Sequence, residues 1–256
     1  MKIKFLGTGT SQGIPVIGSS HPVCLSEDPK DKRLRTSAII TTDDHKKILI
    51  DCGPDFRMQM LLNNEKNVDA VLITHEHNDH IIGLDDTRPI IFRKENSMPI
   101  YCQSRVADAI KTKFPYAFSE NPYPGAPTFC INIIEDKPFQ IGQNTIEPIK
   151  VMHGKLPILG YKINDKLAYI TDASKIADEE KEKIKNMDLL VINCLRAEKP
   201  HHSHYILPEI IELMKELSPQ KSYLTHISYE LGFHRQVEAS LPAPIHLAFD
   251  GLEVNI

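Results

Sequence analysis

The chain has 256 residues, 41% hydrophobic and 25% charged, a composition typical of a soluble globular protein with a substantial core. Its formal net charge of −4 argues against a protein that binds nucleic acid by broad neutralisation of phosphates, so no extended nucleic-acid surface is expected. No apolar run approaches the roughly 20 residues of a membrane-spanning helix.

The cysteines and the first residues predict a cytoplasmic location. The five cysteines are odd in number and form no CxxC pair. Several lie in apolar strings, such as Cys52 in LIDCG and Cys130 in TFCINII, which favours buried, reduced thiols over a disulfide framework. The opening MKIKFLGTGTSQG reaches glycine too early for a signal peptide.

Short β-like strings recur along the chain, and helical patterns are fewer. The predicted strands are residues 2–6, 37–41, 47–51, 69–74, 99–102, 128–134, 145–151, 158–163, 167–171, 189–194, 222–227 and 246–249. The predicted helices are residues 104–114, 178–185 and 208–217, the last beginning with a proline suited to a first helical turn.

Strands in twos and threes, with helices between them, predict two β-sheets packed face to face with helices on their outer faces. The strongest loop signal is SENPYPGAP, residues 119–127. No repeat, low-complexity segment or linker divides the sequence, so residues 1–256 are predicted to form one domain.

The segment ITHEHNDH, residues 73–80, places His75, His77, Asp79 and His80 directly after a predicted buried strand. An extended backbone points His75 and His77 to the same side. Asp79 and His80 are adjacent and are expected to diverge, which suits two neighbouring metal ions better than one. Composition alone gives a fixed HxHxDH pattern on the order of once in a thousand chains, so the segment indicates a metal site more strongly than a histidine-rich surface loop.

THEHNDH after a buried strand resembles the signature of the metallo-β-lactamase-fold hydrolases. Further marks of that family follow in order: KILIDCG with Asp51, IKVMHG with His153, LAYITDAS with Asp172 and SYLTHIS with His226. The resemblance implies an α+β fold, the four-layer αββα sandwich, in which Asp51 supports the metal loop from behind the ligands. It also implies that the three later residues complete the metal site at the ends of their strands.

The resemblance implies two divalent metal ions. The implied ligands are His75, His77 and His153 for one ion, Asp79, His80 and His226 for the other, and Asp172 as the bridge between them. Nitrogen and oxygen donors without thiolate suit Zn²⁺ or Mn²⁺. Two such ions about 3.5–4 Å apart hold a bridging hydroxide at neutral pH and draw charge from the group under attack. Such a pair of cations would stabilise an anionic phosphodiester under attack more than a neutral substrate.

Within the superfamily the sequence resembles the PhnP-like phosphodiesterases. The resemblance rests on GTGTSQGIP, GLDDTRP, PHHSH, and LTHISYELG with LAFDGLEV. It implies hydrolysis of a small cyclic or nucleotide-type phosphodiester, with Asp79, His204 and His201 as catalytic residues. His204 would protonate the leaving group or contact the phosphate, with His201 in support; the alternative is a cap on the following helix. Arg88 is a candidate anion clamp, unless it pairs with Asp85 or Asp86.

One departure from the PhnP-like pattern is informative. Such proteins often bind a structural zinc through a C-x-C-x-x-C cluster and a histidine three residues past the last catalytic ligand. Here these positions are Ser19, His21, Cys24 and Tyr229, which leaves at most two ligands. The structural zinc is therefore predicted to be absent.

The opening glycines, Gly7, Gly9 and Gly13, precede a proline and not a helix. They are predicted to form a tight loop close to the metal site, not a dinucleotide-binding fingerprint.

Other functions share these ligands. A tRNA 3′-processing endonuclease would need a long basic arm, and the sequence has no glycine- and lysine-rich insertion. A thioesterase or lactamase would use the same metals on a neutral carbonyl. A non-catalytic accessory role, suspected for some relatives in PQQ biosynthesis, conflicts with the complete ligand set. The resemblance also admits a homodimer, although no exposed apolar stripe in the sequence marks an interface.

Overall fold

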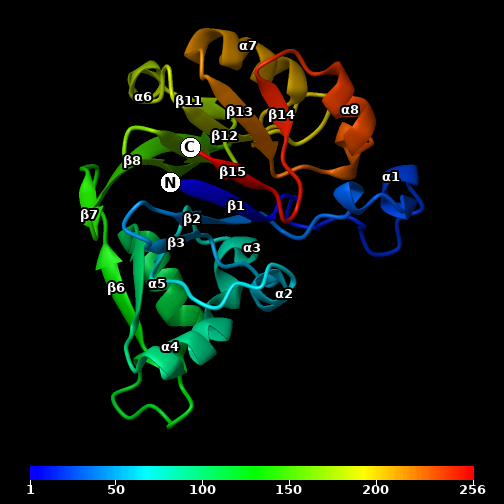
Figure 1. The fold of residues 1–256 in the computed structure, drawn as a ribbon. Coiled ribbons are helices and arrows are strands. Elements are labelled where there is room, and N and C mark those ends of the chain that lie inside the picture. The colour runs from blue at the N-terminus through cyan, green and yellow to red at the C-terminus, as the bar shows by residue number, and fades with distance from the viewer.

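The computed structural model describes all 256 residues and consists of two β-sheets between two layers of helices (Figure 1). The first sheet has the strand order β15-β1-β2-β3-β4-β5-β6. Its strands are β1 (Lys2–Gly7), β2 (Ser37–Thr41), β3 (Lys47–Ile50), β4 (Ala70–Leu72), β5 (Met98–Cys102), β6 (Phe129–Ile133) and β15 (Glu253–Asn255).

The second sheet has the order β11-β8-β9-β10-β12-β13-β14, and β7 pairs with β8 outside this path. Its strands are β7 (Phe139–Ile141), β8 (Asn144–His153), β9 (Leu156–Ile163), β10 (Leu167–Ile170), β11 (Lys175–Ile176), β12 (Leu189–Asn193), β13 (Lys221–Thr225) and β14 (Ile245–Leu247). Both sheets mix parallel and antiparallel pairs.

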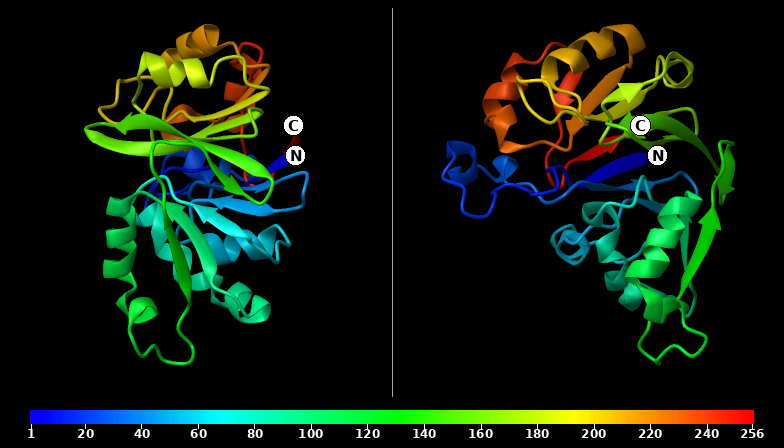
Figure 2. Two further views of the ribbon diagram at one scale, coloured as in Figure 1. Left: turned by 90° about the vertical axis from the view of Figure 1, so that its left-hand side faces the viewer. Right: turned by 180° about the vertical axis from the view of Figure 1, so that it is seen from behind.

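The helices cover the outer faces of the two sheets (Figure 2). On the first sheet lie α2 (Phe56–Leu62), α3 (Asn78–Ile81), α4 (Arg88–Lys94) and α5 (Ser104–Lys113); on the second lie α6 (Asp178–Lys183), α7 (Leu207–Leu217) and α8 (His234–Ser240). The short α1 (Pro22–Leu25) belongs to a loop that extends from the body (Figure 1). No helix combines the length and the apolar content that a bilayer span requires.

Three layers of apolar side chains separate the four layers of secondary structure, as the αββα prediction requires. Alternation along β3 shows how one strand serves two layers: Ile48 and Ile50 face the second sheet, and Leu49 faces the helices. The third layer lies between the second sheet and its helices, with Ile192 and Met214 among its members. The predicted sandwich is confirmed.

The predicted helices correspond to α5, α6 and α7, whereas α2, α4 and α8 were not predicted. In α2 the apolar pattern is blurred, because Met58, Leu61 and Leu62 are exposed beside the buried Phe56 and Met60. The cysteine prediction was wrong at one position. Cys130 is exposed because it lies on the edge strand β6, and the other four thiols are buried.

A buried polar group, here called the Arg33 cluster, joins the N-terminal loop to the C-terminal segment. It consists of Thr8, Asp31, Arg33, His234 and Asp250. Arg33 Nη1 donates to Thr8 Oγ1 at 2.7 Å and Nη2 lies 3.1 Å from His234 Nδ1. Thr8 in turn donates to Asp250 Oδ1 at 2.7 Å. The cluster therefore connects segments that are more than 200 residues apart in the sequence.

Candidate metal centre

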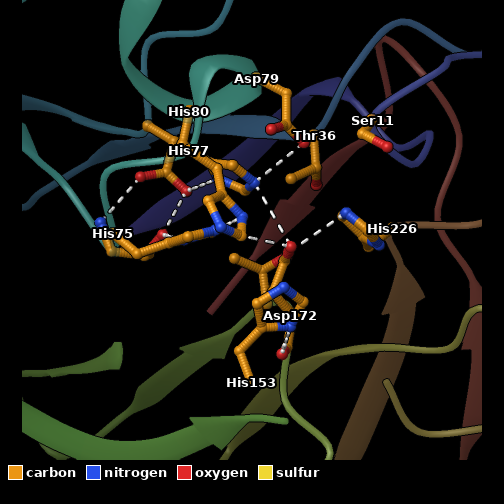
Figure 3. A network of polar contacts seen from close by, with 12 residues as sticks. Ser11, Thr36, His75, His77, Asp79, His80, His153, Asp172 and His226 are labelled. Carbon is orange, nitrogen blue, oxygen red and sulfur yellow. Dashed lines mark hydrogen bonds and ion pairs between the residues drawn. The ribbon is translucent and has the colours of Figure 1, made fainter. Parts of the chain in front are cut away.

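The candidate ligands lie at or just beyond the carboxyl ends of strands from both sheets. The segment after β4 carries His75, His77, Asp79 and His80; His153 ends β8; Asp172 follows β10; and His226 follows β13. Figure 3 shows these side chains pointing toward one centre. Asp172 and His226 have φ angles of 56° and 53°, a left-handed conformation that turns each side chain out of its strand.

The first group of ligand atoms comes from His75, His77 and His153, and these atoms lie within 4.8 Å of one another. His75 Nε2 faces His77 Nδ1 at 3.0 Å. His153 Nδ1 lies 2.8 Å from the carbonyl oxygen of Asp172 and 2.9 Å from that of Ser203. Because a carbonyl only accepts, the Nδ1 of His153 carries the proton and its Nε2 lone pair is free to bind a cation.

The second group comes from Asp79, His80, Asp172 and His226. His80 Nε2 lies 3.3 Å from Asp79 Oδ2 and 3.5 Å from Asp172 Oδ2. The predicted divergence of Asp79 and His80 was therefore wrong. Residues 78–81 form the helical turn α3, and both side chains reach the same carboxylate-lined centre from it.

Asp172 lies between the two groups. Its Oδ1 is 3.2 Å from His226 Nε2, and its Oδ2 is 3.8 Å from His75 Nε2 in the first group. A carboxylate placed in this way could ligate two ions at once, and the bridging role that the resemblance implied for Asp172 stays a prediction.

Asp51 lies beneath the metal loop and orients it. Its Oδ2 accepts from His80 Nδ1 at 2.7 Å, and its Oδ1 accepts from the amide of Thr74 at 2.8 Å. The Thr74 hydroxyl also donates to Asp51 Oδ2 at 2.9 Å. Because Nδ1 of His80 is held in this way, its Nε2 is directed toward the centre.

Buried nitrogen atoms at the centre lack hydrogen-bond partners, which is what a site for cations requires. They are His80 Nε2, His204 Nε2, His226 Nδ1 and His226 Nε2. A buried polar atom without a partner destabilises a fold by about 1–3 kcal/mol. A neutral imidazole has one free lone pair, so one nitrogen each of His80 and His226, beside ionised carboxylates, can serve divalent cations, with Zn²⁺ or Mn²⁺ suited to nitrogen and oxygen donors.

The ionisation of the site favours cations as well. Burial lowers the pKa of His75 and of His153, and that of His226 to about 4, so these imidazoles are neutral. Burial opposes ionisation of Asp172, but His226 and His80 outweigh it and hold its pKa well below the usual range. The pKa of His80 is raised despite burial, because Asp172 and Asp51 face it. A bound cation would take the place of that proton.

His204 lies next to Asp172 at the centre, and His201 contacts His204. His204 Nε2 is 3.6 Å from Asp172 Oδ2, and its ring stacks on His226 with 4.9 Å between centroids. His201 Nδ1 faces His204 Nδ1 at 3.1 Å. Neither histidine caps α7: the N-cap is Ile206, whose amide donates to Glu209. The capping alternative is therefore not realised.

Arg88 forms an ion pair with Asp85, which is the alternative to an anion clamp that the sequence left open. Its guanidinium pairs with Asp85, and Tyr116 donates to the second carboxylate oxygen of Asp85 at 2.6 Å. Arg88 Nη1 lies 3.4 Å from Tyr123 Oη. These contacts account for the charge of Arg88 without a bound anion, so the anion-clamp role has no support in them.

The positions that would hold a structural zinc make packing contacts. His21 lies against Tyr229 with 4.7 Å between ring centroids, and its Nδ1 accepts from the amide of Val23. Cys24 is buried with Ile14 and Val23 in a small apolar cluster. These contacts hold the loop that carries α1. The absence of a structural zinc stays a prediction.

Glycines let two chain segments approach the ligands closely. Gly9 pairs with Ile227, the residue after His226, so the predicted glycine loop does lie beside the centre. A Cβ on Gly53 would lie 2.1 Å from the carbonyl oxygen of Asp79. The chain after Asp51 can therefore touch α3 only because residue 53 is glycine.

Asn193 supports the site and was not predicted. It ends β12, is fully buried, and pairs with the backbone of Ala173: its Oδ1 accepts from the amide at 2.7 Å and its Nδ2 donates to the carbonyl at 2.9 Å. The same carbonyl accepts from the amide of Tyr205 at 2.8 Å. Asn193 thus fixes the residues beside both Asp172 and His204. The signal in the sequence is a polar residue ending the apolar run LLVIN.

Comparison with known proteins agrees with this fold. A family model described as "Beta-lactamase superfamily domain" matches residues 46–227. A diphosphatase from the PhnP family has a TM-score of 0.92 and 35% identity, covering 100% of this chain and 97% of its own. Zn²⁺-bound PqqB from Methylobacterium extorquens has a TM-score of 0.78 and 17% identity, covering 100% of both chains.

A curated relative from Porphyromonas gingivalis, named octanoyltransferase, is 45% identical over 257 residues. The match covers 100% of this chain and 52% of that relative, so the chain spans about half the relative's length. Fold, ligand positions and family model together show that the chain belongs to the metallo-β-lactamase superfamily of hydrolases. Within that class, identity along the whole length of the diphosphatase places it in the PhnP family.

Proposed function

We propose that the chain hydrolyses a small phosphodiester of the nucleotide type, including a diphosphate in which two phosphoryl groups share an oxygen. The observation that carries the proposal is the pair of ligand groups joined by Asp172. Anionic phosphoryl groups need more charge neutralisation than a neutral carbonyl does, and two cations supply it. The related PhnP-family diphosphatase supports this choice of substrate class.

Residues at different positions in the site have different roles in the proposed reaction. When bound, a pair of divalent cations lowers the pKa of a water molecule and draws charge from phosphoryl oxygens. Asp172, Asp79 and the histidines would hold that pair, and Asp51 keeps His80 turned toward the centre.

His204 is placed to handle the proton of the leaving group. Its Nε2 faces the centre without a partner, and its Nδ1 faces His201. Burial lowers the pKa of His201 to about 4, so His201 is neutral and accepts from His204 Nδ1. In its imidazolium form His204 carries a second proton on Nε2, and it can give that proton to the departing oxygen and remain neutral with Nδ1–H donating to His201.

The competing functions have less support. A tRNA 3′-processing endonuclease would need a basic arm that the sequence lacks. Acyl transfer through a thioester, suggested by the name of the P. gingivalis relative, would need a reactive thiolate. Burial raises the pKa of Cys102 to about 12 and that of Cys194 further, and Cys130 lies on the margin of the first sheet. The chain matches only 52% of that relative, so we do not assign the acyl-transfer activity in its name to this chain.

The direct test compares three substrates in the presence of Mn²⁺ or Zn²⁺: bis(p-nitrophenyl) phosphate, a dinucleoside diphosphate and a thioester. We expect turnover of one or both phosphate substrates, with the thioester at least about tenfold slower in kcat/KM, a difference of about 1.4 kcal/mol in the barrier. Faster hydrolysis of the thioester would contradict the proposed substrate class. Equal activity of Asp172→Ala and the parent protein would contradict the two-cation site.

A further inference from the structure

The first group of ligands is assembled from both sheets. His75 and His77 come from the segment after β4, in the first sheet, and His153 ends β8, in the second. The Nδ1 of His153 bonds to the carbonyl oxygens of Asp172 and Ser203, which belong to the second sheet and the loop after it. Metal ligands must be held within about 0.5 Å of their binding geometry by supporting contacts. The first group therefore needs a contact that holds its two parts together.

The residue between His75 and His77 points to helix α5. Glu76 Oε1 lies 2.8 Å from the Nε of Arg105, which is in the first turn of α5. The Nε–H is not aligned with that oxygen for a hydrogen bond, so the contact is an ion pair. The other oxygen of Glu76, Oε2, is buried without a hydrogen-bond partner. Arg105 is therefore the cation that anchors the loop between its two histidines.

The same guanidinium reaches the hairpin that carries His153. Arg105 Nη2 donates to the carbonyl oxygen of Pro157 on β9 at 2.8 Å, and β9 pairs with β8. Farther along β9, the amide of Leu159 donates to the carbonyl of Thr74 at 3.2 Å. Pro157 is closer than Leu159 to the turn between β8 and β9, so Arg105 links the two segments on the side where the ligands lie.

We propose that Arg105 is a positioning residue for the ion of the first group, because one guanidinium holds the loop through Glu76 and the hairpin through Pro157. Several N–H donors in one rigid plane suit arginine to such a double contact. None of the polar contacts of Arg105 reaches the second group. Its influence should therefore be confined to one of the two ions. The inference rests on the two-cation centre of the proposed function.

Two backgrounds that each lack one ligand separate the ions. His226→Ala disables the second group and leaves the first complete, whereas His77→Ala does the reverse. Isothermal titration with Zn²⁺ or Mn²⁺ measures ion affinity in each background, with and without Arg105→Ala. We expect Arg105→Ala to weaken binding by about 10–100-fold in the His226→Ala background, as is typical for residues behind metal ligands. Binding in the His77→Ala background should stay nearly unchanged.

The ion count of the otherwise unchanged chain gives a second measurement. After dialysis, Arg105→Ala should retain one ion per chain where the parent protein retains two. Arg93→Ala is the matched control, because Arg93 also extends from an outer helix, α4, and donates to Asn67 at 2.8 Å. It should retain both ions. If a background binds no ion by itself, this count decides.

A comparison of stability separates positioning from general support of the fold. Partly exposed ion pairs contribute little to stability, so urea unfolding of the metal-free Arg105→Ala should match that of Arg93→Ala. Arg105→Lys keeps a charge beside Glu76 but lacks the planar fork, so it should lose less ion affinity than Arg105→Ala. Glu76→Gln removes the ion pair and keeps the size of the side chain. It should weaken the first group in the same direction, and it replaces Arg105→Ala if that variant does not fold.

Equal weakening of both ions by Arg105→Ala would overturn the proposal, because it would make Arg105 a general support of the fold. Unchanged affinity for both ions would overturn it as well. None of these measurements uses substrate turnover. A parent protein that binds two ions but hydrolyses no phosphodiester would contradict the proposed function and leave the role of Arg105 intact, whereas one that binds no ion would overturn both.

Discussion

The metal centre and the Arg33 cluster are both buried and both built from histidine and aspartate, yet they differ in whether their polar atoms are paired. None of the unpartnered buried atoms belongs to the Arg33 cluster, whereas four lie at the metal centre. A cluster that satisfies its own hydrogen bonds stabilises the fold, and one that leaves lone pairs unused indicates a missing ligand. The two sites are therefore distinguished by whether their buried polar atoms have hydrogen-bond partners, and not by their residue types.

One pair of histidines shows the contrast at the level of single atoms. The pKa of His226 and that of His234 are both lowered to about 4, chiefly by burial. His234 Nδ1 nevertheless has the guanidinium of Arg33 as a donor at 3.1 Å, whereas neither ring nitrogen of His226 has a hydrogen-bond partner. Both imidazoles are neutral, but only that of His226 has its nitrogen lone pair available for a cation.

The largest effect is expected from replacing these two histidines in parallel. His226→Ala should lower kcat/KM by roughly 10³-fold, because a lost ligand removes several kcal/mol of charge stabilisation. His234→Ala should retain kcat/KM but lose about 1–3 kcal/mol of stability, because the Nη2 of the buried Arg33 is left without its acceptor. Steady-state kinetics and urea unfolding measure the two quantities. If His226→Ala lost mainly stability and His234→Ala lost mainly activity, the distinction between a cation site and a stabilising cluster would be contradicted.

The next largest effect is expected at His204. His204→Ala should lower kcat by about 10²–10³-fold on a substrate with a poor leaving group, because it removes a proton donor. The loss should shrink on bis(p-nitrophenyl) phosphate, whose leaving group needs little protonation. His202→Ala is the matched control, since His202 is exposed in the same segment. An equal loss on both substrates would assign His204 to phosphate binding or to the metal site.

A smaller effect is expected at Asn193, which positions Asp172 without facing the centre. Asn193→Asp keeps the size of the side chain but cannot donate to the carbonyl of Ala173. We expect metal affinity and kcat to fall by about 10–100-fold, as is typical for residues behind metal ligands, with little change in KM. Isothermal titration with Mn²⁺ and kinetics at saturating metal measure both. Unchanged metal affinity would contradict the proposed role of Asn193 in positioning Asp172.

The smallest effect on catalysis is expected at Asp250, in the Arg33 cluster. Burial raises its pKa to about 6, so the folded state binds its proton more tightly than the unfolded state does. Stability from this group is fully present below pH 4 and is lost as the pH rises through about 6, by at most about 3 kcal/mol. Asp250→Asn should flatten this part of the stability profile, measured by urea unfolding from pH 4 to pH 7. A steeper fall in the variant would contradict the assignment.

The two halves of the metal centre differed in how far the sequence could predict them. His75, His77, Asp79 and His80 are contiguous, so local pattern and a preceding strand were sufficient to find them. The local pattern missed the convergence of Asp79 and His80, which only the resemblance implied, because α3 is a single turn, too short to give a helical period. His153, Asp172 and His226 lie at or just beyond the ends of separate strands, and only a family resemblance joined them.

Features that depend on distant partners were not predicted. The carboxylate of Asp250 meets Thr8 across 242 positions, and Asn193 meets Ala173 across 20. No pattern in the sequence reports such pairs, because the fold alone brings them together. The exposure of Cys130 was missed for the same reason, because an apolar string of residues has the same sequence pattern whether its strand lies inside a sheet or at the edge.

The count of divalent ions bound per chain tests the central claim most directly. Purified protein loaded with Zn²⁺ or Mn²⁺, freed of excess ions and analysed by inductively coupled plasma mass spectrometry should contain two ions per chain. Asp172→Ala should contain fewer than two, and His234→Ala should contain the full two. A parent protein that retains no ions, or an Asp172→Ala variant that retains both, would contradict the account of unpaired atoms as a cation site.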